Sequence, residues 1–116
     1  MSTIKRSIST HVLDTSTGKP ARDLAILLER KRDAGWEKVG AASTNADGRA
    51  PELVPGGAKI APGVYRLTFE TGAYFKAGGV QGFYPSVTVL FELRDDSHHH
   101  VPLLLSPFGY STYRGS

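Results

Sequence analysis

The chain has 116 residues, 40% hydrophobic and 22% charged, which is typical of one globular domain and excludes a disordered or membrane-spanning chain. The absence of cysteine excludes disulfides, thiolate nucleophiles and cysteine zinc sites. The net charge is +3 and the basic residues are scattered, so we predict no nucleic-acid or membrane partner. Because no apolar segment of signal-peptide length precedes the first strand-like pattern, we expect a single cytoplasmic domain over residues 1–116.

The first half of the chain is predicted to form short strands that end at turns. Residues 8–14 alternate in polarity, so we expect Ile8 and Val12 on one face and His11 on the other. The Thr-Gly-Lys-Pro sequence at 17–20 marks a turn, because glycine can supply a positive φ and proline fixes its own. The strands expected in this half are residues 8–14, 24–32, 36–43 and 49–54, the last beginning at Arg49.

The second half continues the strand pattern around one helix. Alternation is clearest over residues 64–70, where Tyr65, Leu67 and Phe69 define a core face. We expect Thr71 to cap a helix over residues 73–77 that ends at Gly78-Gly79. Another strand follows at residues 87–93. About seven or eight short strands with one short helix predict an all-β fold, an antiparallel β-sandwich.

Residues 98–116 carry the most informative pattern. In the strand expected over residues 98–105, the odd-numbered positions from Val101 onward are apolar and are assigned to the core. A turn at residues 106–109 and a second strand at 110–113 follow. We expect the apolar packing near the terminus to come from Leu103, Leu105 and Phe108. The face turned away from the core is expected to carry His98, His100, Pro102 and Leu104.

The chemistry of the chain is expected from Arg49 and the four histidines, three of which are consecutive at residues 98–100. Histidine exchanges protons near neutral pH because its unperturbed pKa is about 6.5. His98 and His100 share a face, which suits a metal site, but no carboxylate or cysteine accompanies them at ligand spacing. A structural role, with the imidazoles hydrogen-bonded at an interface, is a further alternative.

Other catalytic groups find little support in the sequence. There is no Gly-x-Ser-x-Gly elbow for a serine nucleophile and no Gly-x-x-x-x-Gly-Lys phosphate loop. Asp95 and Asp96 are adjacent, and neighbouring residues of a turn point apart, so we expect them to be solvated. Acid-base work by histidine therefore remains the most direct reading.

Three motifs connect the chain to a known family. The C-terminal Tyr-Arg-Gly-Ser, residues 113–116, follows a His-x-His-Val-Pro-Leu-Leu-Leu-Ser-Pro strand that begins at His98. Ser-Thr-His-Val-Leu-Asp occurs at residues 9–14, ahead of Thr-Gly-Lys-Pro-Ala, and Asn-Ala-Asp-Gly-Arg occurs at residues 45–49. With these motifs the chain resembles the 5-hydroxyisourate hydrolases, the transthyretin-like enzymes of purine breakdown. One departure is His99, where that family commonly has tyrosine.

The resemblance implies a transthyretin-like sandwich and a homotetramer, two dimers packed around a channel with sites at the dimer-dimer contact. It implies hydrolysis of 5-hydroxyisourate to 2-oxo-4-hydroxy-4-carboxy-5-ureidoimidazoline, with no metal or cofactor. The catalytic residues expected are His11, Arg49, His100 and Ser116. The substrate-binding residues expected are His98, Leu104, Tyr113 and Arg114.

Each residue has an expected task in this reading. His11 and His100 activate water as general base and return the proton to the leaving nitrogen, and Arg49 stabilises the developing negative charge. Tyr113 closes the site, and the α-carboxylate of Ser116 orients a histidine or arginine. Arg114 has the alternatives of a solvated charge or a subunit contact.

Two other classes of protein remain open from the residues alone. One is a transthyretin-like carrier of a small aromatic ligand, although carriers of that type lack the Tyr-Arg-Gly-Ser terminus and the catalytic residues found here. The other is a structural β-sandwich that uses its histidine-rich face only for assembly.

Overall fold

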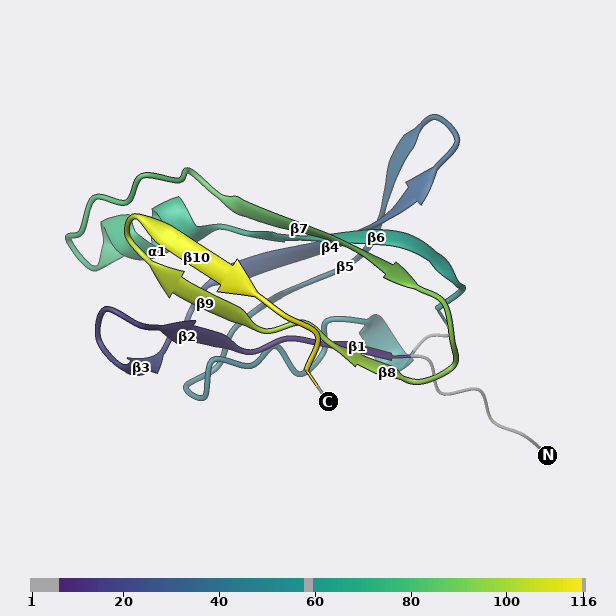
Figure 1. Cartoon of the computed structure of the whole chain (residues 1–116), viewed down its shortest axis with the longest axis horizontal. Coiled ribbons are helices and arrows are strands. Elements are labelled where there is room, and N and C mark those ends of the chain that lie inside the picture. The colour runs from purple at the N-terminus through teal and green to yellow at the C-terminus, as the bar shows by residue number, and fades with distance from the viewer. Residues whose placement is uncertain (1–6, 58–59, 116) are drawn as a thin grey trace.

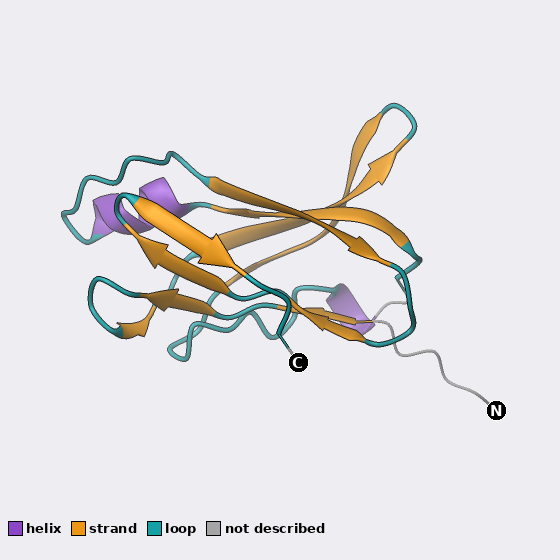
Figure 2. Ribbon diagram, in the orientation of Figure 1, coloured by secondary structure: helices purple, strands orange, loops and turns teal. Residues whose placement is uncertain are grey.

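The computed structural model describes residues 7–57 and 60–115, which form a sandwich of two β-layers with one α-helix at an end (Figures 1 and 2). One layer is a four-stranded sheet, and the other contains a four-stranded sheet and the two-stranded pair of β1 and β8. Their strands are β1 (Ser7–Ser9), β2 (Val12–Asp14), β3 (Lys19–Pro20), β4 (Ala25–Arg32), β5 (Gly35–Ser43), β6 (Gly63–Phe69), β7 (Val87–Leu93), β8 (His98–His100), β9 (Leu103–Ser106) and β10 (Gly109–Thr112). The helix is α1 (Thr71–Ala77), and η1 (Pro55–Gly57) is a 3-10 turn.

One sheet is wholly antiparallel, with strand order β5-β4-β6-β7. The hairpin of β4 and β5 closes by pairing Arg32 with Gly35, and its tip extends beyond the body of the sandwich (Figure 1). Strand β6 contributes the alternating side chains of Tyr65, Leu67 and Phe69, which are at most 1% exposed. The expected core face of this strand is therefore confirmed.

The other layer is mixed, which differs from a purely antiparallel sandwich. The four-stranded sheet has the order β10-β9-β2-β3, and β2 runs parallel to β9 with Val12 opposite Leu103. Strand β1 also runs parallel to β8. Parallel neighbours require a long connection between them. Here the connection contains the four strands of the opposite sheet, β4 to β7, before the chain returns to form β8 and β9. The sandwich class is confirmed, while the pairing of its first and last strands was not predicted.

The core lies between the two layers. Val12, Leu28, Leu67, Phe69 and Leu103 are fully buried and come from both sheets. Burying side chains of this size stabilises the fold by about 1.5–3 kcal/mol each before the entropy cost of folding.

The helix forms where expected, with a different start. Its N-cap is Glu70 and makes no side-chain capping bond, so Thr71 is the first helical residue instead of the cap. Gly78 ends the helix, and Gly79 follows with a φ of 72°, a value that glycine adopts without strain. The hydroxyl of Tyr74 donates to buried Asp14 at 2.8 Å and ties the helix to the end of β2.

Further local expectations were wrong. The strand expected over residues 98–105 breaks at Val101-Pro102, and Pro102 is buried instead of lying on an open face. Phe108 is 74% exposed in the turn between β9 and β10, so it supplies no core packing. Arg49 lies in an isolated bridge followed by turns, because Pro51 donates no ladder hydrogen bond.

Among the described helices none has both the length and the apolar character needed to cross a membrane. The extent of the domain, residues 1–116, stays a prediction.

Candidate active site

His11 and Arg49 are brought together by a turn. They form an antiparallel bridge, and Asn45 shapes the turn because its side-chain oxygen accepts the backbone N–H of Arg49 at 3.1 Å. Gly48 has a φ of 76°, and a Cβ added there would lie 2.5 Å from the Val12 carbonyl oxygen. Glycine is therefore required for this close approach, which holds half-buried His11 beside exposed Arg49.

His98 and His100 are positioned by the parallel pairing of β1 with β8. Ser7 lies opposite His98 and Ser9 lies opposite His100. Because side chains alternate along a strand, these four point to one face, while Ile8 and His99 turn to the core and are 7% and 6% exposed. The predicted division of the three consecutive histidines between two faces is confirmed.

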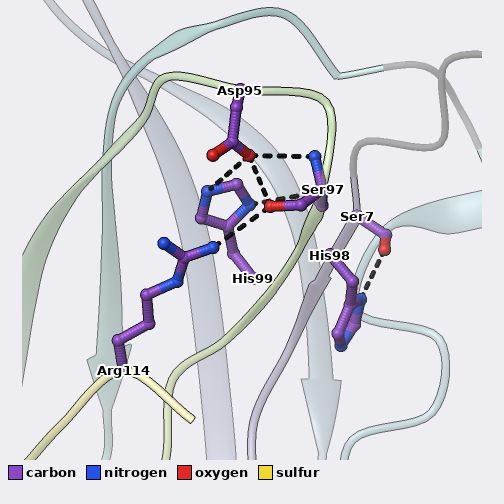
Figure 3. A network of polar contacts seen from close by, with 6 residues as sticks. All are labelled: Ser7, Asp95, Ser97, His98, His99 and Arg114. Carbon is purple, nitrogen blue, oxygen red and sulfur yellow. Dashed lines mark hydrogen bonds and ion pairs between the residues drawn. The ribbon is translucent and has the colours of Figure 1, made fainter. Parts of the chain in front are cut away.

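The hydroxyl of Ser9 lies between the two outward-facing imidazoles. Its Oγ is 2.7 Å from Nε2 of His98 and 2.8 Å from Nδ1 of His100. The two rings are nearly parallel, with centroids 6.5 Å apart and planes 19° apart. Ser7 Oγ is hydrogen-bonded to the other nitrogen of His98, Nδ1 (Figure 3).

The C-terminal segment returns to the same strand. Gly115 donates its backbone N–H to the carbonyl oxygen of His100 at 2.9 Å, and the two residues form an isolated antiparallel bridge. The yellow segment that follows β10 in Figure 1 accordingly runs toward β1 and β8. Ser116, expected to be catalytic, lies outside the described residues.

Arg114 is held by a polar network at the turn before β8 (Figure 3). Its guanidinium donates to the Ser97 hydroxyl at 3.1 Å, and that hydroxyl donates to the carboxylate of Asp95. The ring of His99 lies in the same network, with Nδ1 donating to the Ser97 carbonyl oxygen at 2.9 Å and Nε2 3.7 Å from Asp95. Asp95 is exposed, as expected, but it also takes part in an ordered turn, which was not predicted.

The environment of His100 favours a neutral imidazole. Burial lowers the pKa of His100 from its ordinary value of 6.5, and the positive charge of Arg49 lowers it further. His98 and His11 add smaller effects in the same direction. These surroundings disfavour a positive charge on His100, so a neutral His100 is still available to accept a proton somewhat below pH 6.5.

Tyr113 and Leu104 occupy different places around this cluster. Tyr113 is 58% exposed and lines a cavity of about 240 Å³ together with His99, His100 and Arg114. Leu104 is half-buried on β9, opposite Leu13, on the outer face of its sheet. A larger cavity of about 420 Å³ beside α1 contains none of the predicted site residues.

Sequence reasoning missed the serines. Ser7 and Ser9 alternate with the same period as His98 and His100, and that shared period was the available signal. The pairing of strands 91 residues apart, which turns the two patterns into contacts, could not be read from the local sequence.

The fold and the cluster define a class: a two-layer β-sandwich with histidine and arginine side chains gathered where β1 and β8 meet the segment that ends at Gly115. The chain belongs to the HIUase/Transthyretin family, which matches residues 8–115. The chain is 47% identical over 110 residues to a 5-hydroxyisourate hydrolase of Salmonella dublin, covering 94% of this chain and 80% of that relative.

Solved structures agree with this assignment. The 5-hydroxyisourate hydrolase of Klebsiella pneumoniae superposes with a TM-score of 0.84 at 38% identity, covering 96% of this chain and 94% of that one. Sea bream transthyretin in complex with thyroxine superposes with a TM-score of 0.86 at 31% identity, covering 93% of each chain. The backbone is thus equally similar to an enzyme and to a ligand-binding protein, and the side chains must distinguish the two.

Proposed function

We propose that this protein hydrolyses 5-hydroxyisourate to 2-oxo-4-hydroxy-4-carboxy-5-ureidoimidazoline in urate degradation. The observation that carries the proposal is half-buried His100, coupled to Arg49, His98 and His11 and held by Gly115 of the terminal motif. The higher identity to hydrolases than to transthyretin supports the same choice.

His100 and His11 serve as the acid-base groups in this proposal. A neutral imidazole removes a proton from the attacking water and later returns one to the leaving ring nitrogen, a contribution of typically 10²–10⁴-fold. The lowered pKa of His100 keeps this residue neutral at physiological pH. Which of the two histidines accepts the first proton is settled by comparing the pH profiles of the two single variants.

Arg49 stabilises the oxyanion that forms on the attacked carbonyl. Its guanidinium is always charged and offers several donors in one plane, which suits a substrate with several carbonyl oxygens. The bridge to His11 keeps this charge beside the acid-base group. Arg49 thereby acts on both the substrate and the protonation of His100.

The remaining residues bind or enclose the substrate. His98 and Tyr113 contact the ring, Leu104 forms an apolar wall and the α-carboxylate of Ser116 orients a neighbouring side chain. The Ser97 bond of Arg114 supports an anchoring role for this arginine, which leaves substrate contact as its second proposed task.

The site is proposed to be completed by assembly. A homotetramer, built as a dimer of dimers, would enclose the outer face that carries Leu13, Leu104 and the imidazoles, and exclude water from the reaction. Sedimentation velocity tests this proposal, because a monomeric active enzyme would contradict it. The cytoplasmic location stays a prediction from the sequence.

The acid-base groups act here without a metal in the proposed mechanism. Within residues 7–57 and 60–115 no group of three or more histidine, aspartate or glutamate side chains could hold a metal ion. Activity should therefore survive dialysis against a chelator, and loss of activity that zinc restores would contradict this part of the proposal.

The test of function also separates the enzyme from the carrier. Urate oxidase generates 5-hydroxyisourate, and its ultraviolet decay is followed with and without the protein. We expect faster decay with the protein. An unchanged decay together with tight binding of an aromatic ligand would favour the carrier.

A further inference from the structure

The serine and histidine side chains on β1 and β8 form an uninterrupted hydrogen-bonded row from the surface to His100. The row is Ser7 Oγ, His98, Ser9 Oγ and His100, joined through Nδ1 and Nε2 of His98 and Nδ1 of His100. His98 is exposed to solvent, whereas Ser7, Ser9 and His100 are half-buried. We propose that this row is a proton relay that carries protons between solvent and His100, with Ser9 and His98 as its essential members.

The relay rests on the proposed function, because that reaction produces a proton. Water adds to the ring carbonyl, the carbon-nitrogen bond breaks, and the leaving ureido nitrogen takes up one of the two protons of that water. The carboxylic acid formed ionises, so each turnover must deliver one proton to solvent. A half-buried base releases its proton, and is ready for the next turnover, faster when it has a defined path to water.

The geometry ties the protonation of the two rings to each other. Ser9 has one hydroxyl proton and two imidazole nitrogens within 2.8 Å, so it donates to one ring and accepts from the other. When Ser9 donates to His98, Nδ1–H of His100 donates to Ser9. Nε2 of His100 then has a free lone pair and is a base. When Ser9 donates to His100, Nε2 of His100 carries the proton and is an acid.

Proton transfer along the row balances at every atom. Nε2 of His100 takes a proton from water, and its Nδ1 proton passes to Ser9 Oγ. The former hydroxyl proton of Ser9 passes to Nε2 of His98, and the Nδ1 proton of His98 leaves through Ser7 or directly to solvent. Each group gives one proton and receives one, and the row is left in the arrangement in which His100 is an acid.

The charges around His100 favour transfer outward along this row. Arg49 and His11 lie on the other elements that face His100 and disfavour a second positive charge there. An imidazolium on exposed His98 is better solvated than one on half-buried His100. The relay therefore moves positive charge from a less favourable to a more favourable place.

The experiment compares Ser9→Ala, Ser9→Thr and His98→Ala with the wild-type enzyme in the 5-hydroxyisourate decay assay. Ser43→Ala, at an exposed position on β5 in the opposite sheet, is the matched control. We expect Ser9→Ala and His98→Ala to lose about tenfold or more in turnover, with the 10²–10⁴-fold typical of a proton-transfer contribution as the upper range. Ser9→Thr keeps the hydroxyl and should retain most of the activity.

Rescue separates a relay from a packing role. Added imidazole should restore His98→Ala, because a free ring can accept the proton from Ser9, but it should not restore Ser9→Ala. Turnover is also measured in mixtures of light and heavy water. In the wild type the rate should vary with the deuterium fraction along a curve, because several protons move together. In Ser9→Ala the rate should vary linearly with the deuterium fraction.

An active wild type whose His98→Ala variant keeps full activity, or loses activity that imidazole does not restore, would overturn the relay alone. A wild type that leaves the decay of 5-hydroxyisourate unchanged would overturn the proposed function, and the relay with it.

Discussion

Gly115 and His100 are paired so closely that no side chain fits between them. The backbone N–H of Gly115 donates to the His100 carbonyl oxygen at 2.9 Å, and a Cβ on Gly115 would lie 2.5 Å from Cδ2 of the His100 ring. The terminal motif thus fixes the backbone of His100 and packs against its imidazole. The third residue of Tyr-Arg-Gly-Ser therefore must be glycine because a side chain would clash with His100, and not because the backbone turns there.

Gly115→Ala should therefore damage the site more than the fold. The added methyl must push the imidazole or the terminal segment aside, and a shift of that size at an acid-base group should lower turnover about tenfold or more. Gly109→Ala is the control, because a Cβ there meets only Ser106 Oγ, at 3.6 Å. Turnover and the urea unfolding midpoint are measured for both, and equal turnover in the two variants would contradict this role.

The loss of activity on the acid side of the pH profile should occur below pH 6.5, the ordinary pKa of histidine. Burial and Arg49 lower the pKa of His100, so the neutral base persists to lower pH. Arg49→Gln should move the pKa of His100 back toward 6.5 and Arg49→Lys should keep it low, as followed by NMR titration of the ring. A pKa unaffected by the loss of the arginine charge would show that the two groups are not coupled.

The same shift makes stability depend on pH. The unfolded chain takes up the proton near pH 6.5, whereas folded His100 resists it, so its contribution is present above that pH and is lost as the pH falls. His100→Gln should therefore lose less stability than the wild type between neutral and mildly acidic pH. Denaturant midpoints at the two pH values measure the difference.

Tyr74→Phe should lower stability while leaving activity unchanged. It removes the 2.8 Å bond to Asp14, a carboxylate that is 3% exposed, and should cost about 1–3 kcal/mol of unfolding free energy. Burial and the Asp14 bond raise the pKa of Tyr74 to about 12, so the contribution is present below pH 10 and is lost as the pH approaches 12. Tyr110→Phe, at an exposed ring, should change stability by less than about 0.5 kcal/mol.

Ser97→Ala should loosen the terminal segment. The Ser97 hydroxyl accepts from Arg114 and donates to Asp95, so its loss frees the guanidinium from the turn. Exposed contacts of this kind are weak, so carboxypeptidase should trim the variant only up to about fivefold faster. Ser111→Ala, on exposed β10, should be trimmed at the wild-type rate. Arg114→Gln should match Ser97→Ala, and the double variant should be no faster than either.

The alternation of side chains along a strand was sufficient to predict much of the core and the orientation of the histidines. Buried Ile8, Val12 and Leu103 and outward-facing His98 and His100 all follow from the period of two. This rule is local and needs no partner strand. It succeeds where one face of a strand is buried and the other is open.

What the sequence did not reveal depends on contacts between distant segments. The parallel register that sets Ser9 beside His100, and the return of Gly115 to the same residue, are fixed by the closure of the whole sandwich. The exposure of Phe108 and the burial of Pro102 likewise depend on where the last two strands meet the rest of the sheet. The local pattern of hydrophobic residues contains no information about these contacts between distant segments.

The decay of freshly generated 5-hydroxyisourate tests the central claim most directly, when wild type, His11→Ala, Arg49→Ala and His100→Ala are measured side by side. The account predicts rapid decay with the wild type and decay close to the spontaneous rate with each variant, while circular dichroism and sedimentation stay unchanged. Full acceleration by folded His100→Ala would contradict the assignment of the active site.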